Sequence, residues 1–346
     1  MDNAATTLLD PEVAEAMKEY MSCGNPSSVH DFGLVAKDAI EKARIQVAAA
    51  INAEPEQIVF ISGATEGCAW FSNRYGAAYV SEVEHHAVLN AKHYAEISLS
   101  NIRKCKVIPG FAYSIMAVNN ETGEVFDTYK LSKQIHESTE NGLFFVDATA
   151  AVGKIPIDVT AMNVDYLVAS AHKFHGPKGV GFIYMKEPLT PMINGGGQEF
   201  GLRAGTENVA GIVGCGYAIK KATQSMDQHN AVVSLVSQHF QNRIKTITDC
   251  EIWRNGEHQI PHILNYTFKG VRSEELIEFL NMYKIYVSAG SACNSSDGKP
   301  SHVLKACGLS DDDANSSIRF SLDYSNTKDE VDMVIETLRE GIKMLK

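Results

Sequence analysis

Apolar residues along this chain alternate between short continuous runs and longer stretches with helical spacing. Five of the runs have the length and composition of buried strands and occupy residues 58–61, 114–118, 143–147, 166–169 and 180–185. The longer stretches predict helices over residues 10–21, 31–51 and 127–139, and another directly after the turn at 62–66. Strands that alternate with helices in this way predict an α/β fold, with a mostly parallel sheet covered on both faces.

The last third of the chain has shorter elements in a different order. Residues 207–247 read as two long helices with a break near Asp227. Strands are then expected at 262–268, 285–288 and 317–322, and helices at 273–281, 300–307 and 328–345. This succession predicts a compact α+β domain that follows the larger α/β domain.

Composition excludes several classes of protein. The chain has 346 residues, 45% hydrophobic and 21% charged, and its net charge of −11 argues against direct nucleic-acid binding as its main role. No apolar run approaches the roughly 20 residues that cross a bilayer, and the first residues lack the pattern of a secretory signal. The seven scattered cysteines include no C-x-x-C pair, so we expect no metal site, no disulfide framework and a reducing cytoplasm.

A lysine and an aspartate follow two neighbouring apolar runs. Asp147 ends the run at 143–147, and Lys173 comes shortly after the run at 166–169. This pair suits pyridoxal 5′-phosphate (PLP), because the lysine would form a Schiff base and the acid would keep the pyridine nitrogen protonated. A buried aspartate and an exposed lysine in an ordinary α/β sheet explain these two residues equally well.

The phosphate of such a cofactor would need hydrogen-bond donors near the same strand ends. The turn Ser62-Gly63-Ala64-Thr65 joins a strand to a helix, so that Gly63 permits close backbone approach and the helix amides point at the anion. Ser170 and His172 flank Lys173 and are placed to donate to the same phosphate. A turn with glycine and threonine is common, so this signal is weak by itself.

Two further loops carry candidate cofactor contacts. His85 follows a strand-like stretch and its imidazole can stack on a flat ring, although surface histidines in a loop are the simpler explanation. The glycine-rich segment 195–206 precedes a helix and ends at Thr206, which could meet an anion in this subunit or in a neighbour. That segment is also consistent with a merely flexible loop.

A cysteine and an arginine complete the candidate chemistry. Cys293 lies in a loop of small residues, where a thiol is accessible and nothing in the sequence buries the sulfur. The other six cysteines have helical or apolar surroundings and read as core residues. Arg319 lies within an apolar strand and needs a partner, and a substrate carboxylate would suit its planar fork.

The order of these motifs along the chain resembles the cysteine desulfurases of the NifS/IscS-like group, in the class-V aminotransferase family of PLP enzymes. The matching stretches run from the first residues to the last quarter of the chain: 2–7, 24–28 with His30, 62–66, 84–85, 118–121, 146–149, 172–173 with 176–179, 195–199, 203–206, 290–293 and 319–321.

The resemblance implies the PLP-dependent transferase fold of type I, with a seven-stranded, mostly parallel sheet. It implies a large PLP-binding domain over residues 13–230. The small α+β domain would combine residues 1–12 and 231–346 and carry the loop of Cys293.

The resemblance also implies a role for each candidate residue. Lys173 would hold PLP covalently and Asp147 would face its pyridine nitrogen, while His85 stacks on the ring. The phosphate would be held by Ala64, Thr65, Ser170 and His172, and by Thr206 from the other subunit of a homodimer. The carboxylate of L-cysteine would be held by Asn120 and Arg319.

In the implied reaction, Lys173 moves the Cα proton and Cys293 attacks the sulfur of the substrate. L-alanine leaves and a persulfide remains on Cys293, to be passed to an acceptor protein of iron–sulfur assembly or tRNA thiolation. Two alternatives stay open. One is another PLP reaction of the same fold, such as that of a selenocysteine lyase or a transaminase, and the other is a weakly active PLP-binding partner in sulfur relay.

The chain departs from the family's pattern at several points. Where the family usually has a glutamine that reaches the phenolic oxygen of the cofactor, this chain has Ala150. After Glu66 the family usually has an acid and an asparagine, and here Gly67-Cys68-Ala69 follows. The stretches between Trp70 and Tyr79 and between Lys92 and Phe111 are also shorter. We therefore expect a changed titration of the cofactor and slower turnover or a narrower set of acceptors.

Overall fold

The chain divides into two units in the computed structural model, which describes residues 1–346 except 77, 92–94 and 291–298. The larger unit contains Thr7–Val118 and Phe126–Gln224. The smaller unit contains Met1–Thr6, Asn119–Val125 and Ser225–Lys346. The short segment Asn119–Val125 belongs to the smaller unit although it lies far from the rest of that unit in the sequence.

The larger unit is built on a seven-stranded sheet in the order β1-β7-β6-β5-β4-β2-β3. All neighbours in this sheet are parallel except β7, which runs antiparallel to both β1 and β6. The strands are β1 (Ile58–Ile61), β2 (Tyr79–Ser81), β3 (Ala95–Ile97), β4 (Ala112–Ser114), β5 (Leu143–Asp147), β6 (Tyr166–Ser170) and β7 (Gly181–Met185). The predicted seven-stranded, mostly parallel sheet is confirmed.

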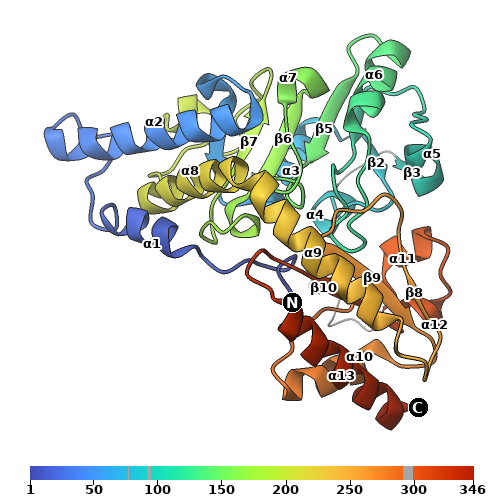
Figure 1. The fold of residues 1–346 in the computed structure, drawn as a ribbon. Helices are drawn as coiled ribbons and strands as arrows, with labels where there is room; N and C mark the ends of the chain where they lie inside the picture. The colour runs from blue at the N-terminus through green and yellow to red at the C-terminus, as the bar shows by residue number, and fades with distance from the viewer. Residues whose placement is uncertain (77, 92–94, 291–298) are drawn as a thin grey trace. The chain divides into compact units, whose positions relative to one another are not determined.

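Helices cover this sheet and set its loops. The long helices α2 (Asp31–Ile51) and α8 (Val209–Gln224) lie side by side (Figure 1), and α3 (Ala64–Arg74) packs on the central strands. The other helical segments of this unit are α1 (Pro11–Lys18), α4 (His86–Leu89), α5 (Leu99–Arg103), α6 (Thr128–Ser138), α7 (Val159–Met162) and the 3₁₀ turns η1 (Pro55–Gln57), η2 (Ala171–Lys173) and η3 (Glu199–Gly201).

The smaller unit has a three-stranded antiparallel sheet in the order β10-β9-β8, with β8 (Ile252–Arg254), β9 (Ile263–Phe268) and β10 (Ser317–Ser321). Its helices are α9 (Met226–Ile244), α10 (Ser273–Met282), α11 (His302–Ala306), α12 (Asp311–Ala314) and α13 (Lys328–Leu345). One apolar cluster, which includes Phe240, Phe268 and Phe320, forms the core between helices and sheet. The predicted α+β organisation is confirmed.

Two predicted strands differ in the structure. The run at 114–118 was expected as one strand, but β4 ends at Ser114; beyond it, the Ile115 and Ala117 amides still donate to carbonyls of Phe145 and Asp147. The strand expected at 285–288 is reduced to a single bridge between Ser288 and Arg319. There the Ile285 amide bonds back to the end of α10, so pairing starts only at Ser288.

No helix within the described residues has both the length and the apolar character that a membrane span requires.

Candidate active site

Register around Gly181 brings two predicted cofactor loops together. Ile61 at the end of β1 and Ser170 at the end of β6 both pair with Gly181 of the intervening strand β7. A Cβ at Gly181 would lie 2.4 Å from the Ala169 carbonyl oxygen and 3.1 Å from the Cα of Gly63. Only glycine allows this approach, so the turn after β1 and the turn after β6 meet at one edge of the sheet.

The turn after β1 leads straight into the N-terminus of α3. Gly63 is the N-cap and provides no side-chain cap, so the first helix amides, at Ala64 and Thr65, remain available to an anion. Glu66 stabilises the turn because its carboxylate accepts the Ser62 amide at 2.7 Å. The same carboxylate accepts from Arg203 Nε at 3.0 Å, which ties the glycine-rich segment to this turn.

The unusual Gly67 follows from close packing of α3 on the sheet. A Cβ at this position would lie 2.4 Å from Cγ1 of Val168 on β6 and 3.1 Å from Cδ1 of Ile61. A larger residue there would require these two side chains to move. Gly67, which departs from the family's pattern, is therefore required by the close packing of α3 on the sheet.

Asp147 ends β5 in a buried environment, with 7% of its surface exposed. Its Oδ1 accepts the Thr149 amide at 2.8 Å, which fixes the carboxylate at the strand end. The hydroxyl of Thr149 is buried and has no hydrogen bond within the described residues. A buried carboxylate beside an unsatisfied hydroxyl is an arrangement that calls for a polar ligand.

A second buried acid, Glu84, lies near Asp147. Its Oε1 accepts the Met116 amide at 2.6 Å and its side chain is fully buried. Burial and, after it, the charge of Asp147 raise the pKa of Glu84 well above its usual range. Burial likewise raises the pKa of Cys68, which excludes this thiol as a nucleophile at neutral pH.

The turn after β6 presents His172 and Lys173 within η2. The Thr7 amide and hydroxyl both donate to the His172 carbonyl, at 2.9 and 3.0 Å, and Lys154 Nζ donates to the Lys173 carbonyl at 3.3 Å. Burial, followed by the charges of Lys173 and Lys178, lowers the pKa of His172 to about 4. The imidazole is therefore neutral at pH 7. The N-terminal motif acts here by fixing the backbone of the lysine turn.

His85 is held in place as the N-cap of α4. Its Nδ1 accepts the Ala87 amide at 3.1 Å. This bond favours the neutral tautomer with the proton on Nε2 and sets the orientation of the ring.

The glycine-rich segment is anchored through Glu199. Its carboxylate forms two hydrogen bonds to Arg44 of α2 and accepts the Phe60 amide of β1 at 2.7 Å. The segment is therefore not simply a flexible loop. Thr206 at its end is exposed on the surface of this unit.

In the smaller unit, Arg319 and Asn120 lie together. The Arg319 side chain is 1% exposed, and its terminal nitrogens donate to the Asn120 carbonyl at 2.8 Å and to Asp2 at 3.0 Å. Its buried Nε has no hydrogen bond among the described residues. Asp2 is thus the charged partner of Arg319 within this unit, and the Nε donor has no acceptor among the described residues.

Cys293 lies outside the described residues. Three other cysteines, Cys68, Cys215 and Cys250, are buried, and Cys23, Cys105 and Cys307 are half-buried. Within the part of the chain that the structure describes, no group of three or more histidine, cysteine or acidic side chains is placed to hold a metal ion.

Comparison with known proteins identifies the family. The model for class-V aminotransferases matches residues 1–334. The chain belongs to the class-V aminotransferase family. Members of this family use PLP, and the chain is a PLP-dependent enzyme.

Full-length relatives narrow the family. A protein named cysteine desulfurase IscS from Methanosarcina thermophila is 38% identical over 376 aligned positions, which cover 100% of this chain and 92% of that protein. The alignment is longer than this chain, so the relative has residues that this chain lacks. A solved NifS-like protein matches with a TM-score of 0.90 and 32% identity, covering 99% of both chains. A structure titled SspA in complex with cysteine matches with a TM-score of 0.78 and 31% identity, covering 94% of this chain and 99% of that one.

The residues at the sheet edge fit PLP. The uncapped start of α3 suits a phosphate, the buried Asp147 suits a protonated pyridine nitrogen, and the unsatisfied Thr149 hydroxyl lies beside that carboxylate. The sequence analysis assigned no role to four residues that build this edge: Thr7, Arg44, Glu84 and Gly181. A glycine within an apolar strand was the available signal for Gly181.

Proposed function

We propose that this chain is a cysteine desulfurase that converts L-cysteine to L-alanine and captures the sulfur on Cys293. The observation that carries the proposal is the full-length similarity, at 36 to 38% identity, to proteins named cysteine desulfurase. The structure titled SspA in complex with cysteine supports cysteine as the substrate. The reaction balances, because cysteine and a thiol give alanine and a persulfide without a further reactant.

The chain's own residues divide the cofactor work at the edge of the larger unit. Bound PLP supplies an electron-withdrawing ring that stabilises negative charge on the substrate carbon beside the amine. Asp147 would keep the pyridine nitrogen protonated, and the Ala64 and Thr65 amides with Ser170 and His172 would hold the phosphate. His85 would stack on the ring, and its bond to the Ala87 amide supports a fixed orientation of the imidazole.

Lys173 has two tasks in this proposal. It would hold PLP covalently, and its amine would take the proton from Cα of the substrate. The bonds from Thr7 and Lys154 to backbone carbonyls of this turn support a fixed position for that amine.

Asn120 and Arg319 hold the substrate carboxylate in the proposed reaction. The unsatisfied Nε of Arg319 supports this role, since a carboxylate can add the missing acceptor. Asp2 then balances the arginine charge when no substrate is bound.

The Cys293 thiolate attacks the substrate sulfur. A sulfur–sulfur bond forms as the carbon–sulfur bond breaks, and the persulfide passes to an acceptor protein of iron–sulfur assembly or tRNA thiolation.

We propose that the protein acts in the cytoplasm and that it forms a homodimer. The thiols of Cys23, Cys68, Cys105, Cys215 and Cys250 are free, which supports a reducing compartment. Exposed apolar side chains on and before α2, namely Val29, Phe32 and Val35, support burial against a second copy. Thr206 is exposed in the same unit, as a contact to the partner's cofactor requires.

Alanine formation tests the function. Purified protein loaded with PLP and given L-cysteine and a reductant should release L-alanine, and Lys173→Ala should abolish the release. Cys293→Ser separates the alternatives, because transaminase chemistry would survive it whereas desulfurase turnover would not. If the wild-type protein binds PLP but releases no L-alanine, the result would instead favour the weakly active partner in sulfur relay.

A further inference from the structure

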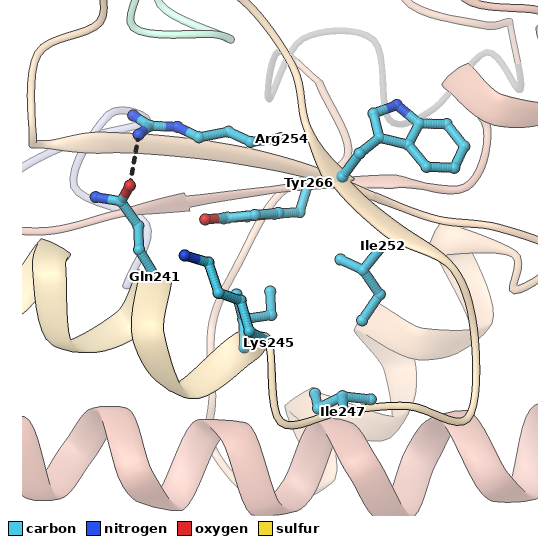
Figure 2. A pocket seen from close by; sticks show the side chains of 8 residues that line it. Gln241, Lys245, Ile247, Ile252, Arg254 and Tyr266 are labelled. Carbon is cyan, nitrogen blue, oxygen red and sulfur yellow. Dashed lines mark hydrogen bonds between the residues drawn. The ribbon is translucent and has the colours of Figure 1, made fainter.

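A pocket of about 400 Å³ lies in the smaller unit between the end of α9 and the outer strand of the sheet (Figure 2). The register explains how it forms. Arg254 on β8 pairs with Tyr266 on β9, and Ile252 lies two residues from Arg254 on the same face. Gln241, Ile244 and Lys245 recur at helical spacing on α9 and line the opposite wall.

The pocket has one charged end and one apolar end. Figure 2 shows the Lys245 ammonium and the Tyr266 hydroxyl on the same side as the hydrogen bond between Gln241 and Arg254. Ile247 and Ile252 lie away from these groups. The volume of the pocket falls in the range of roughly 300–1,000 Å³ that is typical of pockets for small molecules.

Arg254 is half-buried and differs from the two buried arginines of this chain. Arg44 is paired with Glu199 and Arg319 with Asp2. Arg254 donates only to neutral acceptors, the Gln241 side chain at 3.0 Å and the Ile263 carbonyl at 3.4 Å. Its Nε is buried without a hydrogen bond, and no carboxylate pairs with it among the described residues.

No carboxylate among the described residues balances the positive charge of Arg254. Burial lowers the pKa of Arg254, whereas at Arg44 the effect of burial is outweighed by Glu199 and the pKa rises. Lys245, the C-cap of α9, adds a second cation with no ion pair in the described part of the chain. The partial negative charge of the helix end compensates one exposed cation at most. The residues that line the pocket therefore include two cations and no acid.

We propose that this pocket binds a small organic acid, with its carboxylate on Arg254 and Lys245 and its apolar body against Ile247 and Ile252. A carboxylate matches the planar guanidinium and supplies the acceptor that Nε lacks. The isoleucines and the Tyr266 ring exclude a fully polar anion from the apolar end. The site is independent of the PLP reaction.

The test is a titration of the PLP-loaded protein with octanoate, with octanol as the uncharged analogue. Trp253 lines the pocket and is one of two tryptophans in the chain, so its fluorescence reports binding. Octanoate should bind and change the fluorescence, and octanol should bind at least about tenfold more weakly. Trp253→Phe should remove the signal while calorimetry still detects the heat of binding.

Two variants test the charged end. Arg254→Gln and Lys245→Gln should each weaken octanoate binding about tenfold, and Lys343→Gln, at an exposed position of α13, should not. Lys245 has no side-chain partner among the described residues, so its variant folds even if loss of Arg254 disturbs Gln241. Equal binding of octanoate and octanol, unchanged binding by Lys245→Gln, or no binding at all would overturn the proposal.

Discussion

The guanidinium of Arg44 and the carboxylate of Glu199 meet through two parallel hydrogen bonds, at 2.9 and 3.0 Å, inside the larger unit. Phe60 and Phe200 lie on the guanidinium with ring centroids at 5.0 and 4.7 Å. Glu199 and Phe200 both adopt positive φ angles, of 47° and 59°, which are unusual for residues other than glycine. The ion pair therefore holds a strained turn of the glycine-rich segment against α2 and β1.

Replacing Glu199 should destabilise the protein strongly. Glu199→Gln leaves the Arg44 charge buried without its counter-ion, a change that costs about 3–5 kcal/mol. Urea denaturation of the apo-protein measures the loss. The matched control is Glu41→Gln, which removes an exposed carboxylate from the same arginine and should cost no more than about 1 kcal/mol. Equal losses in the two variants would contradict the role given to Glu199.

Replacing Arg203 should weaken PLP binding. Arg203→Gln removes the ion pair that steadies Glu66, and Glu66 accepts the Ser62 amide in the phosphate turn. A charged hydrogen bond of this kind is worth about 1.5–3 kcal/mol, so the Kd for PLP should rise about tenfold or more. Fluorescence titration of apo-protein with PLP checks this. Arg272→Gln, from an exposed pair in the smaller unit, is the control and should leave the Kd unchanged.

Glu84 should make stability depend on pH. Its pKa is raised in the folded protein, so above the unfolded pKa, of about 4.3, the unfolded state releases a proton that the folded state keeps. This group's contribution to stability is therefore greatest at low pH and falls as the pH rises towards the folded pKa. Glu84→Gln keeps the bond to Met116 but does not titrate, so it should gain stability relative to the wild type as the pH rises above about 4.3. A stability difference that does not change with pH, as expected for the exposed control Glu137→Gln, would refute the raised pKa of Glu84.

Ala150 should alter the titration of bound PLP. An alanine cannot donate the hydrogen bond to the phenolic oxygen that the family's glutamine provides, a bond worth about 1.5–3 kcal/mol when charge-assisted. Ala150→Gln should therefore shift the midpoint of the PLP absorbance change by about one to two pH units towards the behaviour of ordinary family members. An unchanged midpoint in this variant would show that the alanine is not the cause.

Sequence patterns predicted the elements that have strong local signals. The predicted helix at 31–51 and strands at 58–61 and 143–147 coincide with α2, β1 and β5, because caps and apolar runs mark their ends. The short strands β3 and β8 were not predicted, since three residues carry too little periodicity. The prediction of a strand at 285–288 was wrong, because the Ile285 amide bonds to the Leu280 carbonyl at the end of α10 instead.

The support of the candidate site could not be predicted in the same way. Thr7 binds the carbonyl of His172, and Arg44 binds Glu199, across more than a hundred residues of chain. No local pattern links such residues, because the contacts depend on how strands and helices pack. The candidates Lys173, Asp147 and Arg319 were visible because each puts a charge beside an apolar run.

The most direct test follows the sulfur atom. PLP-loaded protein is incubated briefly with L-cysteine labelled with a heavy sulfur isotope, and its peptides are analysed by mass spectrometry without reductant. We predict one labelled sulfur atom on the peptide that contains Cys293, none on that peptide after Lys173→Ala, and L-alanine in equal amount. Alanine release with no labelled sulfur on Cys293 would contradict the account.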